Sequence, residues 1–265
     1  MRKLFLKHKD IDKRVFWAWP YLIVLFEFVL LPMLIVALYA FTNGAGHFTL
    51  YNFSLFFTQS DAINTLIYSF GIALITTVVC LLLGYPAAYF MATRSFRIPA
   101  VMVILFILPM WVNFLLRTIA TAELFGLIGL PLDENALIFG MCYDFLPFMI
   151  YPILTSLSKI DVALLEASQD LGATRLQTFF KVILPLSLPG IQSGIIMVFM
   201  PTVSTFAISE LLTHNKIKLF GSIIQESINS GVMLNYGAAL SLILLIFINL
   251  TTLIGKNADK ESSLH

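Results

Sequence analysis

A few ionisable side chains interrupt stretches of this sequence that are otherwise apolar. Asp144 lies one turn before Pro147 inside such a run, Glu210 closes another, and Glu27 lies within a third. A carboxylate in an apolar span is costly, so it is expected to have a function or a partner. The chemistry that it supports is the binding of a cation, because a carboxylate pairs strongly with an ammonium or guanidinium group.

Two interpretations of these carboxylates stay open. They line a pathway for a cationic substrate, or they form structural ion pairs, for example Glu27 or Asp144 with Arg117. Arg117 itself would repel a polycation, so we interpret it as a structural residue or an outer-end anchor. Trp111 and Tyr143 offer aromatic faces to a cation, although packing explains such residues equally well. The predicted pathway residues are Asp144, Glu210, Trp111, Tyr143 and Asn113.

The sequence offers no group of residues for catalysis or for metal binding. It contains no G-x-x-x-x-G-K-[ST], H-E-x-x-H or G-x-S-x-G motif. Cys80 and Cys142 lie in apolar runs, and the four histidines are scattered. We therefore expect a chain without a cofactor of its own that is not an enzyme and binds no ATP through a P-loop.

The composition indicates which kind of element must position these residues. Of the 265 residues, 59% are hydrophobic and 12% are charged, and the mean hydropathy is +0.91. Soluble domains are about 45–50% apolar and about 25% charged. Long uncharged stretches predict an all-α membrane protein, because a helix that crosses the hydrocarbon needs about 20 apolar residues. Six windows qualify, at about 20–41, 63–91, 98–117, 136–158, 185–210 and 235–255.

The basic residues predict the orientation of these spans. If the N-terminal tail, 1–19, is cytoplasmic, thirteen lysines and arginines fall on the cytoplasmic side and three fall outside. The three outer ones are Arg117, Lys216 and Lys218. We therefore predict one transmembrane domain, 20–256, and a cytoplasmic tail, 257–265, with both termini inside the cell.

The segment between the fourth and fifth windows is longer than a turn requires. Asp161 is a plausible N-cap, Gly172 is a plausible residue after the C-cap, and Thr174 begins a second capped turn. The pattern predicts a short cytoplasmic helix over about 161–172. By physical reasoning alone it could equally lie on the membrane surface or dock onto a partner protein.

This segment resembles a known motif. Glu166-Ala167-Ser168, three residues, Gly172, nine residues and then Val182-x-Leu184-Pro185 is similar to the EAA motif, E-A-A-x-x-x-G, nine residues, I-x-L-P. That motif belongs to the permease subunits of binding-protein-dependent ABC importers. Ser168 and Val182 are mild departures from it. Further stretches resemble the PotB-type permease family of spermidine/putrescine importers, namely Leu83–Ala87, Leu108–Asn113, Leu116–Thr118, Leu146–Met149, Asp170–Ala173 and Leu176–Phe179.

The resemblance implies a six-helix, type I (MetI-like) importer permease in the bacterial plasma membrane. It implies four kinds of partner: an ATPase subunit dimer that binds the ATP, a second, PotC-type permease subunit, an extracytoplasmic polyamine-binding protein, and the lipid bilayer. It also implies that the loop helix couples ATP hydrolysis to transport. The coupling residues that the resemblance implies are Asp161, Leu165, Glu166, Ala167, Ser168, Gly172 and Ala173. The chain departs from these permeases in its outer segment 118–135, which is shorter than is usual.

Other classes of membrane protein make different demands on the sequence. A permease of the same type for another small solute would share the coupling loop. A secondary transporter would need inverted repeats or a coupling-ion site, and it would not need such a loop. A membrane enzyme would need converging catalytic groups. The acidic residues in the spans favour a cationic substrate, and nothing predicts binding to nucleic acid.

Overall fold

A computed structural model of the chain describes residues 19–92, 104 and 108–262, with side chains described up to residue 252. Within these residues every regular element is a helix, and one isolated bridge joins Thr42 to Phe48. The all-α prediction is confirmed. The elements are η1 (Phe26–Leu30), α2 (Leu31–Ala40), α3 (Tyr51–Thr58), α4 (Ser60–Ala92), η2 (Leu108–Trp111), α6 (Phe114–Ile128), α7 (Glu134–Leu157), α8 (Val162–Asp170), α9 (Arg175–Thr178), η3 (Phe179–Ile183), α10 (Leu184–Ser204), α11 (Ala207–Leu212), α12 (Phe220–Asn229) and α13 (Leu234–Ser262).

Five helical stretches of the described chain are long and apolar enough to cross a membrane. They are Trp19–Ala40, Ser60–Ala92, Glu134–Leu157, Arg175–Ser204 and Leu234–Thr252. Each overlaps one of the predicted windows. Of the remaining window, 98–117, the structure describes residue 104 and residues 108–117, which include η2 and the first turn of α6.

Two predicted boundaries are wrong, and both errors concern candidate site residues. Arg117 does not end a span: it lies in the first turn of α6, which begins because the Asn113 side chain accepts a hydrogen bond from the Leu115 N–H at 2.8 Å. Glu210 does not close the fifth span, since α10 ends at Ser204 and Glu210 lies on the separate helix α11. The chain is extended at Thr205, where the backbone of Gly221 packs so closely that a Cβ would lie 2.3 Å from the Ser204 carbonyl oxygen.

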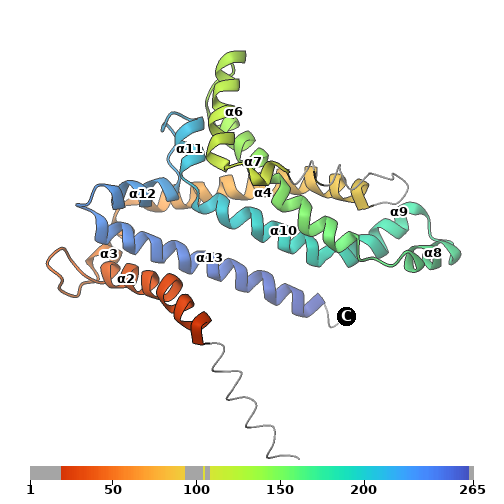
Figure 1. Cartoon of the computed structure of the whole chain (residues 1–265), viewed down its shortest axis with the longest axis horizontal. Coiled ribbons are helices and arrows are strands. Elements are labelled where there is room, and N and C mark those ends of the chain that lie inside the picture. Colours follow the sequence, from red (N-terminus) through yellow and green to blue (C-terminus); the bar gives the residue numbers. More distant parts are fainter. Residues whose placement is uncertain (1–18, 93–103, 105–107, 263–265) are drawn as a thin grey trace, which may run out of the picture.

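Helix α7 is the centre of the bundle and packs against both α4 and α10 (Figure 1). Small residues allow the close approach of α10. A Cβ on Gly190 would lie 2.7 Å from the Pro152 carbonyl oxygen, and one on Gly194 would lie 3.1 Å from that of Met149. Such contacts are typical of membrane helices, where lipid offers no hydrophobic drive to associate.

Two of the spans contain a turn of π-helix, each just before a proline. The N–H of Leu31 bonds to the Phe26 carbonyl ahead of Pro32, and the N–H of Leu184 bonds to the Phe179 carbonyl ahead of Pro185. Proline lacks an N–H and crowds the carbonyl four residues earlier. The wider turn relieves that crowding without breaking the span.

The two ends of the bundle carry different elements. Helices α8 and α9 lie at one end, and α3, α11 and α12 lie towards the other (Figure 1). Helix α6 stands away from the long axis of the bundle and contacts α7 and α11. The chain therefore places the loop helix and the residues around Glu210 towards opposite ends.

Candidate functional site

The loop helix α8 is capped at both ends, as the sequence predicts. The Asp161 side chain accepts a hydrogen bond from the Ala163 N–H at 3.0 Å. At the other end Gly172 has a φ of +82°, its N–H bonds to the Gln169 carbonyl, and the Ala173 N–H bonds to the Ser168 carbonyl. This paired pattern is the Schellman motif, which turns the chain sharply out of the helix.

A second capped turn joins α8 to the fifth span. The Thr174 hydroxyl accepts a hydrogen bond from the Gln177 N–H, and the Gln177 side chain accepts one from the Thr174 N–H. The hydroxyls of Ser168 and Thr178 lie 2.9 Å apart and link α8 directly to α9. Since α9 continues through η3 into α10, the loop helix and the fifth span form one connected unit.

The inner side of this unit packs against the bundle, and its outer side is exposed. Leu165 packs against the cluster that α4, α7 and α10 form, while Glu166 and Ala167 are exposed. The apolar side chains of Leu171 and Leu176 are 89% and 71% exposed. A helix that is anchored on one side and presents apolar residues on the other fits a docking surface better than a solvated turn.

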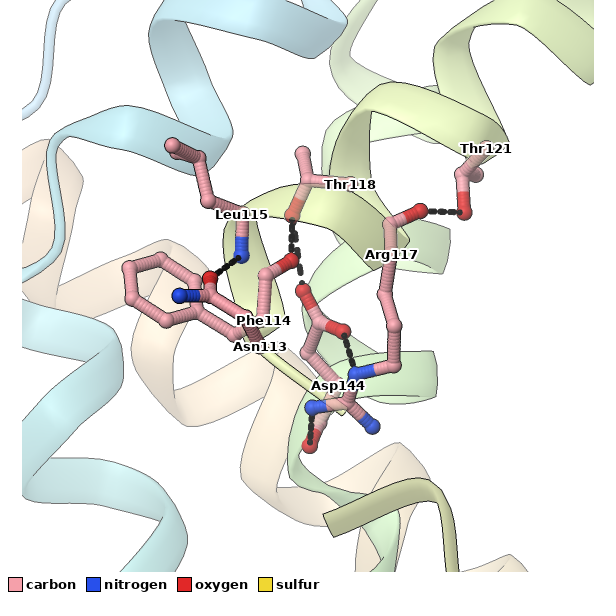
Figure 2. Close-up of polar contacts among 7 residues, drawn as sticks. All are labelled: Asn113, Phe114, Leu115, Arg117, Thr118, Thr121 and Asp144. Atoms are coloured by element: carbon pink, nitrogen blue, oxygen red, sulfur yellow. Dashed lines mark hydrogen bonds and ion pairs between the residues drawn. The ribbon is translucent and has the colours of Figure 1, made fainter. Parts of the chain in front are cut away.

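A buried ion pair joins α6 to α7. The Nε atom of Arg117 lies 3.1 Å from Oδ1 of Asp144, and the Thr118 hydroxyl donates to Oδ2 at 2.9 Å (Figure 2). The Arg117 Nη2 donates to the Asp144 backbone carbonyl at 3.4 Å. The structure therefore contains the Arg117–Asp144 ion pair that the structural interpretation predicts. Within the described chain, Asp144 does not face an open cavity.

Among the other predicted pathway residues, Tyr143 contacts the Arg117–Asp144 pair through Arg117. The guanidinium of Arg117 lies 5.6 Å from the centre of the Tyr143 ring, so this aromatic face already holds a cation. Asn113 caps α6, and Trp111 is exposed on η2. Glu27 is exposed on η1, where it cannot pair with Arg117 in a buried site.

Glu210 lies in a different setting from Asp144. It is exposed and lines a cavity of about 390 Å³ between α11 and α12. The remaining lining residues are Phe206, Asn215, Ser222, Gln225, Glu226, Asn229 and Ser230. Sequence reasoning missed these residues, although the cluster of amides, hydroxyls and a carboxylate over 222–230 is unusually polar for this chain.

The chain is similar to known transport proteins. It matches the family of binding-protein-dependent transport system inner membrane components over residues 81–261. It is 36% identical over 213 residues to the spermidine/putrescine transport system permease protein PotB of Escherichia coli (strain K12), with 74% of this chain and 77% of that protein covered. It is 31% identical over 277 residues to PotB of Haemophilus influenzae, with 96% and 95% covered.

Solved structures show the same fold. The bacterial alginate ABC transporter in complex with an alginate pentasaccharide-bound periplasmic protein matches with a TM-score of 0.71 at 16% identity, and 98% of each chain is covered. The MetNI methionine ABC transporter, in inward-facing conformations, matches with a TM-score of 0.61 at 18% identity, covering 76% of this chain and 95% of that one. The predicted MetI-like importer fold is confirmed. This multi-pass membrane protein therefore belongs to the family of binding-protein-dependent transport system inner membrane components.

Proposed function

We propose that the protein is a permease subunit of an ATP-driven importer and forms half of a pathway for polyamines. The observation that carries this proposal is helix α8, which bears the Glu166-Ala167-Ser168…Gly172 motif, is capped at both ends and projects at one end of the bundle. The similarity to the spermidine/putrescine permeases PotB supports the choice of substrate.

The connection from α8 to α10 supports a mechanical role for the loop helix. A force applied to α8 is transmitted through the Ser168–Thr178 contact and the Thr174–Gln177 capping box. It then reaches α10 through η3, whose π-turn keeps the helix continuous up to Pro185. An ATPase subunit that closes on ATP and pulls α8 would thereby move the fifth span against α7.

Partner proteins hydrolyse the ATP, complete the pathway and deliver the substrate. ATP is bound and hydrolysed by a pair of ATPase subunits, and this chain has no ATPase activity of its own. A second permease subunit of the PotC type completes the pathway, and an external binding protein delivers the polyamine. The exposed apolar residues Leu164, Leu171 and Leu176 are the surface that α8 and α9 offer to the ATPase.

Uptake measurements test this function. The full chain is expressed with an ATPase, a second permease subunit and a binding protein of a spermidine/putrescine importer, in cells that lack their own polyamine uptake. We expect ATP-dependent accumulation of radiolabelled spermidine and putrescine that disappears when this chain is omitted. Accumulation of neither amine, with all four proteins present in the membrane fraction, would contradict the proposed substrate.

A further inference from the structure

Tyr85 of α4 contacts both ends of the hydrogen bond that closes the π-turn in the fifth span. That bond runs from the Leu184 N–H to the Phe179 carbonyl. At one end, the rings of Tyr85 and Phe179 pack edge to face, with their centres 5.9 Å apart and an angle of 86° between their planes. At the other end, Tyr85 reaches Leu184 through Ser187. A residue of another span therefore contacts the π-turn on both sides.

Two hydrogen bonds in series make the contact with Leu184. The Ser187 hydroxyl donates to the Leu184 carbonyl at 2.9 Å. A hydroxyl has a single proton, so in the 3.1 Å contact between Tyr85 Oη and Ser187 Oγ the tyrosine is the donor. Ser187 is fully buried, and Tyr85 is half-buried. Because Ser187 is shielded from solvent, water does not compete for this bond.

The same part of α4 supplies a second aromatic contact. The ring of Tyr89, one turn after Tyr85, lies 5.5 Å from the Phe179 ring at an angle of 89°. All three rings pack against the cluster that α4, α7 and α10 form, towards the end of the bundle that carries α8 and α9 (Figure 1). Edge-to-face pairs favour a defined geometry, so these contacts specify the direction of the Phe179 side chain.

The π-turn has an alternative that these contacts oppose. It contains one residue more than the α-helical turn that would replace it. That replacement would rotate the preceding residues by about 100° about the helix axis, since an α-helix makes one turn every 3.6 residues. Such a rotation would carry Phe179 away from Tyr85 and would turn α8 and α9 relative to α10. The contacts of Tyr85 therefore stabilise one register of the segment from α8 to α10.

Helix α4 is itself weakened beside Tyr85. The next residue, Pro86, lies inside α4 and has no N–H to bond to the Leu82 carbonyl. Sharp kinks in helices occur mostly at such positions. A force on Tyr85 therefore acts at the place where α4 bends most easily.

We propose that Tyr85 is a positioning residue of the coupling mechanism, which holds the π-turn in its register and makes α4 move together with the loop helix and the fifth span. The inference rests on the proposed ATP-driven transport and adds a second span to the part of the chain that the ATPase moves. A force on α8 passes through the Ser168–Thr178 contact to α9, and from Phe179 it crosses to Tyr85 of α4. Without the contacts of Tyr85, the π-turn would absorb the displacement of α8 instead of transmitting it.

Hydrogen exchange reports on the π-turn in this chain directly. The full chain in lipid nanodiscs is exchanged into D₂O, and the deuterium uptake of peptides that cover residues 179–184 is followed by mass spectrometry. Tyr85→Phe keeps the ring and removes the hydroxyl, so we expect these amides to exchange about 2- to 10-fold faster. Tyr236→Phe is the matched control, because it removes another buried tyrosine hydroxyl, which donates to Gln59 at 3.2 Å. It should leave exchange over 179–184 unchanged.

The ratio of transport to ATP hydrolysis is the second readout. In proteoliposomes that hold the reconstituted complex, Tyr85→Phe should lower spermidine uptake about 3- to 10-fold while ATP hydrolysis falls less than about 2-fold. Ser187→Ala breaks the same series of hydrogen bonds, so we expect a similar loss, and the double variant should lose no more than either single variant. Tyr236→Phe should keep the ratio of the unsubstituted chain.

The two readouts separate this role from the proposed function. Unchanged exchange over 179–184 in the Tyr85→Phe chain overturns the proposal, as does faster exchange with an unchanged ratio of uptake to hydrolysis. Equal losses in Tyr85→Phe and Tyr236→Phe also overturn it, because they indicate a general loss of packing. An unsubstituted complex that hydrolyses ATP but imports no polyamine contradicts the proposed function, and the exchange rates of the two variants then decide by themselves whether Tyr85 holds the π-turn.

Discussion

Arg117 and Asp144 lie on different helices and neutralise each other inside the protein. Their Nε and Oδ1 atoms are 3.1 Å apart, and the side chains are only 7% and 1% exposed. The Nη1 atom of Arg117 has no hydrogen-bond partner in the described part of the chain. Removing one partner of a buried pair leaves an uncompensated charge, whereas replacing both partners can be nearly neutral. The pair therefore ties α6 to α7, and Arg117 already neutralises the Asp144 carboxylate.

Asp144→Asn is expected to destabilise the protein, because it leaves the Arg117 charge buried without a partner. The loss should be about 3–5 kcal/mol in the free energy of unfolding, measured by denaturant titration of the full chain in detergent. The double variant Arg117→Gln/Asp144→Asn should recover most of this loss, since two amides can hydrogen-bond to each other. Polyamine uptake should be lowest for Asp144→Asn, higher for the double variant and highest for the unsubstituted chain.

The exposed pair of Lys218 and Glu226 is the control for that experiment. Breaking it by Glu226→Gln should change the free energy of unfolding by less than about 1 kcal/mol, because solvent already screens the pair. If the double Arg117/Asp144 variant folds stably but stays as inactive in uptake as Asp144→Asn, then Asp144 acts on the substrate and not through Arg117.

Gly172→Val is expected to uncouple ATP hydrolysis from uptake. Gly172 has a φ of +82°, and a Cβ there would meet no atom within 4 Å, so the cost lies in the backbone conformation alone. That cost is about 1–2 kcal/mol for an L side chain, enough to shift the end of α8 without unfolding the membrane domain. ATPase activity of the reconstituted complex should persist while spermidine uptake falls at least about 10-fold.

Gly129→Val is the matched control for Gly172→Val. Gly129 also has a positive φ, +72°, and open space around its Cβ position, but it ends α6 and does not touch α8. It should impose the same strain and leave coupling intact. Gly172→Asn should retain uptake, because asparagine tolerates the left-handed conformation. Normal uptake by the Gly172→Val complex would contradict the coupling role of α8.

Glu166→Ala is expected to weaken the association of the ATPase subunit. Glu166 is exposed on α8 and makes no ion pair within the described chain, so its charge is free to meet a basic residue of a partner. The amount of ATPase that co-purifies with the permease should fall about 3- to 10-fold at physiological salt. Arg175→Ala, which changes an exposed charge on α9, serves as the comparison; an equal loss in both variants would argue against a specific contact of Glu166.

The membrane orientation follows from the distribution of basic residues and is tested with reporter fusions. Fusions after Arg94 and Gly172 and at the C-terminus should report the cytoplasmic side, and fusions after Gly46, Leu132 and Asn215 should report the outer side. A cytoplasmic reporter after Asn215 would reverse the placement of the Glu210 cavity and contradict the topology.

Features that depend on residues close together in the chain could be predicted from the sequence. The apolar stretches had to become helices, because the hydrocarbon offers no partners for backbone polar groups. The caps at Asp161 and Thr174 and the turn at Gly172 use hydrogen bonds between residues two to five apart, so their residue types and spacing predicted them. The coupling motif could be located for the same reason.

Relations between residues far apart in the chain depend on how the helices pack, and the sequence does not specify them. Whether Asp144 faces a pathway or Arg117 depends on how α6 and α7 are rotated about their axes. A span that is hydrophobic on all sides has no distinct apolar face, so its sequence does not specify that rotation. The break after Ser204 coincides with the close approach of Gly221, which is 17 positions further along the chain. No local pattern encodes that packing, and beyond the break Glu210 lies on α11, where it lines the cavity with residues of α12.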